Sequence, residues 1–192
     1  IQSSTFMACM KLESIEIPRG VTNIWHSAFN GCESLKDVSI PNTVTSIAEN
    51  AFLGCSGVTS LTIGSAVTSI GSYAFSGCSR ISTVTIPNSV TSVGYNAFVG
   101  CTVLKSVTIG TGLTSISSST FSGCENLESL KGCPIEINGK FCFENCKKLV
   151  SLDGMPKKVA GAVECRRCGS KFQKSEISAI CQVGGIIDAY GK

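Results

Sequence analysis

The chain has 192 residues, of which 15% are charged, and its formal net charge is +3 at pH 7. Its length fits a single domain, and it has no run of about 18 apolar residues, so the sequence predicts no membrane-spanning helix. The charge is uneven, since residues 131–192 carry eleven Lys and Arg against six Asp and Glu. We expect this basic region to lack interleaved exposed aromatic residues, and it matches no known motif, which argues against nucleic-acid binding. We interpret it as a solvated surface, with an acidic glycan as the alternative partner.

A phenylalanine and a cysteine, three residues apart, recur together with a constant period of 23 through the first two thirds of the sequence. A constant period of this length indicates a solenoid, in which one supersecondary unit stacks on copies of itself. Ile1 stands eight residues before its cysteine, as Ile24 does one period later, so we expect the sequence to open within a repeat. The recurring residues are Phe6, Phe29, Phe52, Phe75, Phe98 and Phe121, with Cys9, Cys32, Cys55, Cys78, Cys101 and Cys124.

The sequence pattern of each repeat, such as Val67–Ser89, predicts three structural elements in chain order. The segment V-T-S-I indicates a short strand. The following A-F-x-G-C is too short for a stable helix and predicts a helical turn. The last segment, L-x-x-V-x-I, alternates apolar and polar residues with period two and predicts a second strand on the opposite side of the coil. In several units a proline, such as Pro87, ends this strand.

From residue 127 the period shortens to 22, which is the spacing from Cys124 to Cys146 and from Cys146 to Cys168. Ser175 can cap a short helix with Ile177, Ile180 and Cys181 on one face, which predicts a helical cap. We therefore expect an α/β-type solenoid, largely β, with parallel short strands on two sides. It forms one domain over 1–192, with 23-residue repeats over 1–126, 22-residue repeats over 127–168 and a cap over 169–192.

Twelve cysteines would ordinarily suggest a disulfide scaffold. Cysteines at equal repeat positions stack at about the 4.8 Å strand spacing with parallel Cα–Cβ bonds, however, whereas a disulfide needs converging bonds. We expect a column of buried, reduced thiols. A second interpretation concerns Cys142, Cys146, Cys165 and Cys168, whose spacing resembles that of a zinc site. Cys146 and Cys168 continue the repeat, so we favour the structural interpretation and expect no metal.

The sequence offers little material for catalysis. His26, the one histidine, occupies a variable position beside Trp25, and no aspartate falls in a matching column to orient it. No glycine-rich phosphate loop follows a predicted strand, because the glycines belong to the repeat. We therefore expect a protein that is not an enzyme and that uses no cofactor.

The pattern V-T-S-I-G-x-x-A-F-x-G-C-x-x-L-x-S-V-T-I-P, seen in residues 67–87, resembles the BspA-like leucine-rich repeats. The resemblance extends to about Cys168. It implies a leucine-rich-repeat stack, a cell-surface or extracellular location, and adhesion to host or neighbouring-cell surface or matrix proteins. It brings no catalytic residue, and its motif fixes no binding residue.

The outward positions of the L-x-x-V-x-I strand form the expected binding face, which the resemblance implies to be concave. We expect an adhesion or protein-binding module; the alternative is a structural spacer or self-assembling fibre subunit without a specific site. A ladder of Thr22, Thr45, Thr68, Thr91 and Thr114 on the other strand also resembles ice-binding solenoids, although threonine simply suits an exposed narrow strand. The candidate binding residues are Lys36, Asp37, Thr59, Thr62, Thr83, Thr85, Lys105, Thr108, Glu128 and Lys131.

Overall fold

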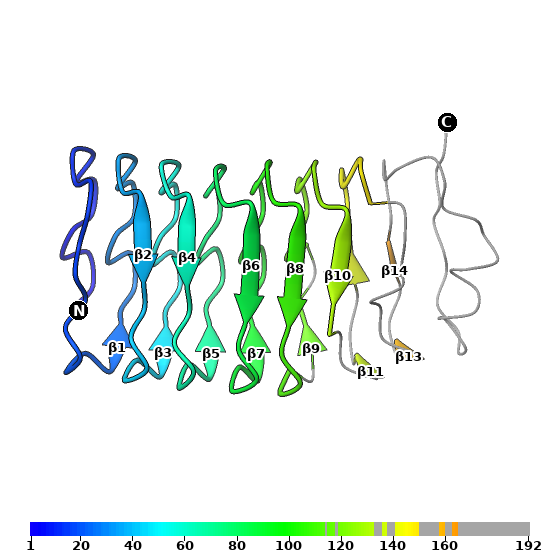
Figure 1. Ribbon diagram of the computed structural model, residues 1–192, viewed down its shortest axis with the longest axis horizontal. Coiled ribbons are helices and arrows are strands. Elements are labelled where there is room, and N and C mark those ends of the chain that lie inside the picture. Colours follow the sequence, from blue (N-terminus) through cyan, green and yellow to red (C-terminus); the bar gives the residue numbers. More distant parts are fainter. Residues whose placement is uncertain are drawn as a thin grey trace.

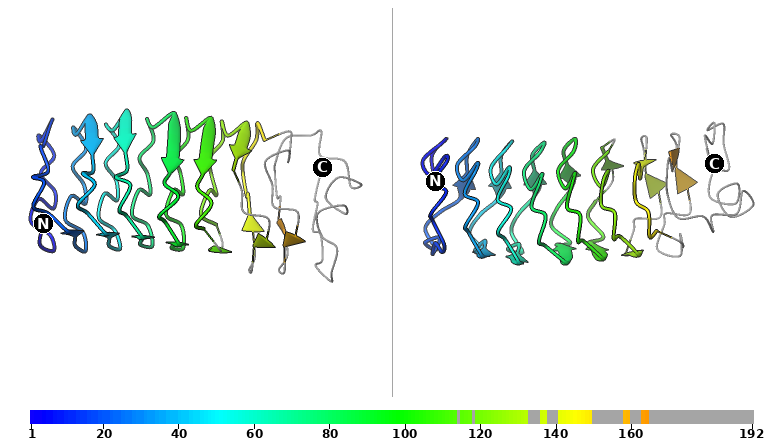
Figure 2. Two further views of the ribbon diagram at one scale, coloured as in Figure 1. Left: turned by 60° about the horizontal axis from the view of Figure 1, so that its bottom comes forward. Right: turned by 90° about the horizontal axis from the view of Figure 1, so that it is seen from above.

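The chain winds into coils that lie side by side in a nearly straight row (Figures 1 and 2). Each 23-residue repeat makes one coil, because equivalent residues of successive repeats are parallel strand partners, as in the pair Ile47 and Ile70. The predicted solenoid with parallel strands on two sides is confirmed. The structure, a computed structural model, describes residues 1–113, 115–117, 119–132, 136–137, 141–149, 158–159 and 163–164.

One row of strands comes from the L-x-x-V-x-I segments. β2 pairs with β4, and β6, β8 and β10 form a three-stranded parallel sheet. In β6, Val84 and Ile86 are buried while Thr83 and Thr85 are exposed, as the period of two predicts. We call the outward surface of this row the β-face. Its strands are β2 (Asp37–Ser39), β4 (Ser60–Thr62), β6 (Thr83–Ile86), β8 (Ser106–Ile109) and β10 (Ser129–Lys131).

A second row of two-residue strands comes from the V-T-S-I segments and forms one parallel five-stranded sheet in the order β1-β3-β5-β7-β9. Its isoleucine or valine column faces the core, as Ile47 and Ile70 do. We call this the narrow row. Its strands are β1 (Asn23–Ile24), β3 (Ser46–Ile47), β5 (Ser69–Ile70), β7 (Ser92–Val93) and β9 (Ser115–Ile116).

Two further strand pairs continue the stack toward the C-terminus with the shorter period, since Glu136 pairs with Lys158 and Phe141 with Val163. β11 (Glu136–Ile137) pairs with β13 (Lys158–Val159), and β12 (Phe141–Cys142) pairs with β14 (Val163–Glu164). The described residues contain no helix, and so none that could cross a membrane. The fold is therefore a β-solenoid rather than an α/β one. The predicted cap over 169–192 lies outside the described residues.

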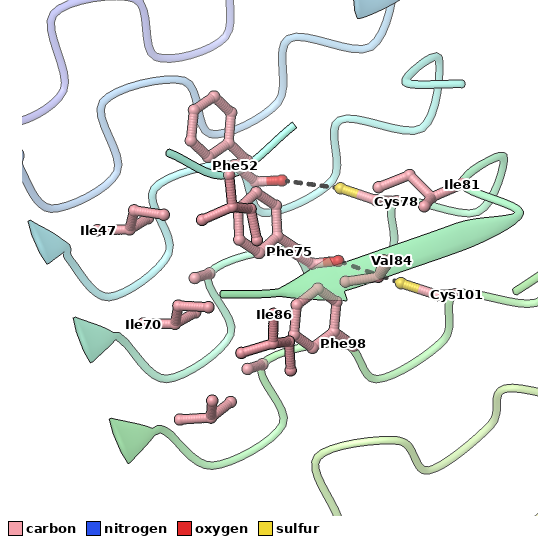
Figure 3. Close-up of a cluster of buried hydrophobic side chains, with 14 of the residues drawn as sticks. Ile47, Phe52, Ile70, Phe75, Cys78, Ile81, Val84, Ile86, Phe98 and Cys101 are labelled. Atoms are coloured by element: carbon pink, nitrogen blue, oxygen red, sulfur yellow. Dashed lines mark hydrogen bonds between the residues drawn. The ribbon is translucent and has the colours of Figure 1, made fainter. Parts of the chain in front are cut away.

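The core is built from columns that run through the stack. Six phenylalanine rings, from Phe6 to Phe121, stack face to face with centroids 4.9–5.8 Å apart and interplanar angles of 5–15°. Figure 3 shows Phe52, Phe75 and Phe98 of this column beside the isoleucines of the narrow row. Burying each such ring stabilises the fold by about 2–3 kcal/mol, so the repeated core rather than helix formation holds the coils together.

The predicted helical turn in A-F-x-G-C is wrong. Tyr73 and Gly77, two residues to either side of Phe75, have φ values of +55° and +72°, whereas a helix requires negative φ. The segment instead forms consecutive tight turns, closed by bonds such as Ser76 N–H to the Tyr73 oxygen at 3.1 Å. The intervening N–H groups donate to the next coil, as Phe75 does to the Ala97 oxygen at 2.8 Å. We call these segments, residues 25–32, 48–55, 71–78 and 94–101, the turn column.

The cysteine column is buried, as predicted, but the thiols are more than small apolar groups. From Cys32 to Cys124 each Sγ donates to the main-chain oxygen of the phenylalanine in the preceding coil, at 3.1–3.4 Å. Two of these bonds are drawn in Figure 3. Burial raises the pKa of the Cys55 thiol to about 12 and holds the pKa values of Cys78 and Cys101 well above the usual value. The thiols are thus neutral donors at physiological pH and resist oxidation.

Candidate functional site

The β-face brings the ten candidate binding residues together on one surface, where all of them are exposed. They occupy columns that continue from coil to coil. Thr59 N–H donates to the Lys36 oxygen at 2.8 Å, and Glu128 N–H donates to the Lys105 oxygen at 2.9 Å. Thr85 pairs in register with Thr108, which pairs with Lys131. The nearly straight row of coils makes this an extended surface, without the marked concavity that was expected (Figure 2).

Charge is confined to the ends of the β-face. Only Glu49 and Arg80 are charged between residues 38 and 104, so the middle of the face consists of serine and threonine hydroxyls. At the N-terminal end, Lys36 is already paired with Glu13, with Nζ and Oε2 2.6 Å apart, and this hydrogen bond lowers the pKa of Glu13. Because both side chains are largely exposed, the pair contributes little stability, but Lys36 is not a free cation for a partner. Lys105 and Lys131 therefore carry the positive charge of the C-terminal half of this face.

The threonine hydroxyls serve the stack as well as the surface. On the β-face, Thr59 Oγ1 donates to the Lys36 oxygen at 3.3 Å. In the threonine ladder beside the narrow row, each hydroxyl donates to the main-chain oxygen of the preceding threonine, at 3.2 Å for Thr45, 3.0 Å for Thr68 and 3.2 Å for Thr91. These inter-coil bonds give the ladder a structural role and account for its threonines without ice binding. Thr114 lies outside the described residues.

An open groove of about 770 Å³ lies at the N-terminal end of the β-face, between the first coil and the end of β2. Its lining includes Glu16 and Arg19 from the first coil, Ser39 and Thr43 from the second, and Thr62 of β4. Two opposite charges beside hydroxyl groups suit a polar peptide, since both hydrogen-bond donors and acceptors are present. The groove touches one candidate binding residue, Thr62, and so extends the β-face.

The described residues hold no recognisable catalytic or metal centre. His26 is exposed beside Trp25, and the described part of the chain contains no cluster of three or more His, Cys, Asp or Glu placed to hold a metal ion. Of the four cysteines weighed for zinc, Cys142 pairs in register with Glu164, so the two cysteine pairs do not occupy equivalent positions. Cys165 and Cys168 lie outside the described residues.

An aromatic patch on the turn column was missed by sequence reasoning. Tyr73 and Tyr95, in neighbouring coils, have ring centroids 5.8 Å apart at an interplanar angle of 77°. Trp25 is 49% exposed and Tyr95 46% exposed, which makes them two of the few large exposed apolar side chains in the described residues. The sequence could have shown this patch, since these aromatic residues lie at variable positions of the repeat and not at the phenylalanine position that forms the core.

Comparison with known proteins agrees with the coil geometry. A family model described as a BspA type leucine rich repeat region matches residues 1–128 and 78–161. Among solved structures, a leucine-rich-repeat protein of T. pallidum is 30% identical, with a TM-score of 0.73 over 77% of this chain and 69% of that one. No curated protein matches this chain significantly.

Two further structures share the fold. A leucine-rich-repeat protein of Bacteroides ovatus is 25% identical, with a TM-score of 0.58 over 93% of this chain and 56% of that one. A leucine rich cell surface protein of Faecalibacterium prausnitzii is 21% identical, with a TM-score of 0.55 over 96% of this chain and 72% of that one. This chain therefore spans between about half and three quarters of the length of these three proteins.

Proposed function

The chain belongs to the BspA-type leucine-rich-repeat family, and from this premise we propose that it is a non-catalytic, protein-binding module of an adhesive surface protein. The observation that carries the proposal is the continuity of the β-face, on which all ten candidate residues are exposed in columns crossing five strands. A face of this kind suits an extended partner, such as a matrix protein or the surface protein of a neighbouring cell.

The residue composition of the β-face favours weak binding of a protein partner. Tight interfaces depend on a few buried aromatic or arginine anchors, whereas the candidate residues are threonines, three lysines and two carboxylates. The pairing of Lys36 with Glu13 removes one of the lysines from recognition. Binding by one module is therefore weak, on the order of micromolar or poorer. Useful adhesion then comes from many copies on one surface, where a high effective concentration multiplies weak contacts.

The surface location rests on the family and on the description of the Faecalibacterium prausnitzii protein as a cell surface protein. Labelling of intact cells with an antibody against the β-face tests it, since an internal protein stays unlabelled until the cells are opened.

The binding proposal is tested by comparing a monomeric module with a tetramerised one on immobilised matrix proteins. The tetramer is expected to be retained and the monomer to wash off. If neither form is retained on any matrix or cell-surface protein, the module is a spacer or a fibre subunit. Light scattering then distinguishes these two alternatives, because a fibre subunit assembles into filaments and a spacer does not.

A further inference from the structure

We propose that the turn column carries a binding subsite for a neutral saccharide, built on Tyr73, Tyr95 and Asn96. The subsite lies on the segments that join the narrow row to the β-face, so it is separate from the protein-binding surface. Three independent features of the described residues meet there: an aromatic pair in which Tyr95 is exposed, a strained backbone position and a buried acceptor without a partner.

The aromatic pair supplies a platform. The main-chain N–H of Tyr73 donates to the main-chain oxygen of Tyr95 at 2.9 Å, and this bond holds the two residues side by side in neighbouring coils. Their rings meet edge to face, and Tyr95 remains 46% exposed. An exposed tyrosine held in place by a second ring presents apolar area at low cost in conformational entropy, and its hydroxyl adds a polar group at the rim.

The backbone at Tyr73 is strained. Its φ of +55° lies in the left-handed region, where a bulky side chain is a rare outlier. In the other 23-residue repeats the residue at the position of Tyr73 is small and polar, which suits that conformation: Ser4, Ser27, Asn50, Asn96 and Ser119. Tyr73 is only half-buried, so the core does not require its ring. Strain of this kind concentrates at ligand sites.

The unpartnered acceptor is Asn96 Oδ1, the only buried side-chain oxygen or nitrogen without a hydrogen-bond partner among the described residues. Asn96 follows Tyr95 directly and occupies the position of Tyr73 one coil later. A buried acceptor without a donor is destabilising and calls for an explanation. Asn96 is half-buried as a residue, so a side-chain adjustment of the kind common at interfaces brings its amide oxygen to an incoming donor.

These features select the chemistry of the ligand. Only Glu49 and Arg80 are charged between residues 38 and 104, and Glu49 is exposed on the turn column, where its carboxylate repels an anionic ligand and accepts hydrogen bonds from the hydroxyl groups of a neutral one. An aromatic face takes the apolar face of a sugar ring, while sugar hydroxyls donate to an amide oxygen. A proline-rich peptide also stacks on aromatic side chains, but proline has no N–H to donate to Asn96 Oδ1. A saccharide satisfies both requirements.

Trp25 extends the subsite along the stack. It lies on the same turn column, two coils before Tyr73, which corresponds to about 10 Å at the strand spacing. The residues that take its position in the next two coils are small, Ala48 and Gly71. Glu49, exposed beside Ala48, adds a hydrogen-bond acceptor between the two aromatic platforms, and this spacing suits an oligosaccharide of several units rather than a single sugar.

The test measures binding of neutral hexasaccharides of glucose, mannose and N-acetylglucosamine to the whole chain by calorimetry, with a sialylated oligosaccharide and a polyproline peptide as comparisons. At least one neutral hexasaccharide is expected to bind. Tyr95→Ala and Asn96→Ser should each weaken that binding about tenfold. Trp25→Ala should weaken binding of the hexasaccharide but not of the matching disaccharide.

The decisive variant is Tyr73→Asn. Asparagine suits the left-handed backbone, as at Asn50, so this variant should melt at the same or a higher temperature and still bind about tenfold more weakly. Val103→Ala, which trims another exposed apolar side chain, is the matched control and should change neither property.

The proposal is overturned if no neutral saccharide binds at millimolar concentration, if affinity survives the tyrosine changes, or if only the polyproline or sialylated probe binds. Charge changes on the β-face should leave saccharide binding unaffected. Failure of the saccharide proposal can therefore be distinguished from failure of the proposal that the β-face binds a protein.

Discussion

The sulfur atom of Cys55 lies 3.1 Å from the main-chain oxygen of Phe29 in the preceding coil. The same oxygen accepts the N–H of Cys32 at 3.1 Å, within its own coil. One carbonyl therefore ties the turn of its coil to the thiol of the next coil. The spacing of three residues between Phe and Cys places the first bond, and the constant repeat period places the second. This double use of one oxygen gives a physical reason for the recurring F-x-G-C motif.

Replacing Cys78 by alanine tests the contribution of the thiol. The change removes a buried sulfur and its bond to Phe52 at 3.4 Å, but the Phe52 oxygen keeps the N–H of Cys55 at 3.2 Å. The oxygen is not left without a donor, so the expected loss is about 1–2 kcal/mol, mostly from the small cavity. Denaturant unfolding measures it. Cys9→Ala, at an exposed position, is the control and should change stability little. An unchanged midpoint for Cys78→Ala contradicts a structural role for the thiol column.

The thiol column should also be inert in the folded protein. Cys32, Cys55, Cys78, Cys101 and Cys124 are buried and form no disulfide, whereas Cys9 is exposed. An alkylating reagent applied to the native, unreduced protein should label Cys9 before any of these five. The same reagent in denaturant, still without reductant, should label all of the buried five, as mass spectrometry of peptides shows. Recovery of two neighbouring cysteines of the column joined by a disulfide contradicts the expected geometry.

The raised thiol pKa values predict a loss of stability in alkali. An unfolded thiol ionises near pH 9, but burial raises the pKa of the Cys55 thiol to about 12 and holds the pKa values of Cys78 and Cys101 well above the usual value. The stability that the buried, neutral thiols contribute is therefore fully present below about pH 8.5. It is lost as the pH rises toward the pKa of the thiols in the folded state. Each fully buried thiol should lower the free energy of unfolding by about 1.4 kcal/mol per pH unit in this range. Melting from pH 7 to 10 measures the slope, which should be shallower in Cys101→Ala. An equal slope in that variant assigns the effect to other groups.

The repeat could be predicted from the sequence because the core columns dictate it. Once the period of 23 is seen, Phe75, Cys78 and the Val84–Ile86 alternation predict the buried residues at the same positions of the neighbouring repeats. The turn column was misassigned because its left-handed residues are marked only by Gly77 and by small polar residues at the position of Tyr73. Those are the residue types that tolerate positive φ, but their recurrence was assigned to variable positions.

The candidate site was predicted less completely than the fold. The exposure of the β-face follows from the alternation in strands such as β6, so Thr83 and Thr85 lie where the sequence puts them. Its electrostatics depend on which side chains of neighbouring coils meet, and the pairing of Lys36 with Glu13 requires coordinates. The unpartnered oxygen of Asn96 likewise has no sequence signal, because an asparagine in a turn ordinarily bonds its neighbours.

The expected absence of a bound metal remains a prediction. In the 22-residue register Cys142 pairs with Glu164 rather than with a cysteine, and Cys146 lies buried in the core. Elemental analysis of purified protein should find no stoichiometric zinc, and a chelator should leave the melting temperature unchanged. About one zinc per chain, lost in Cys165→Ser, contradicts this expectation.

Charge reversal on the β-face measures most directly where a protein partner binds. Tetramerised modules carrying both Lys105→Glu and Lys131→Glu are compared with wild type on the matrix protein that retains the tetramer. Arg80→Glu is the matched control, since Arg80 is exposed but lies outside the candidate columns. The double variant is expected to lose most tetramer binding, while its melting temperature and the binding of the Arg80 variant stay unchanged. Nanomolar binding by the wild-type monomer that persists in the double variant contradicts this expectation and places the partner elsewhere on the chain.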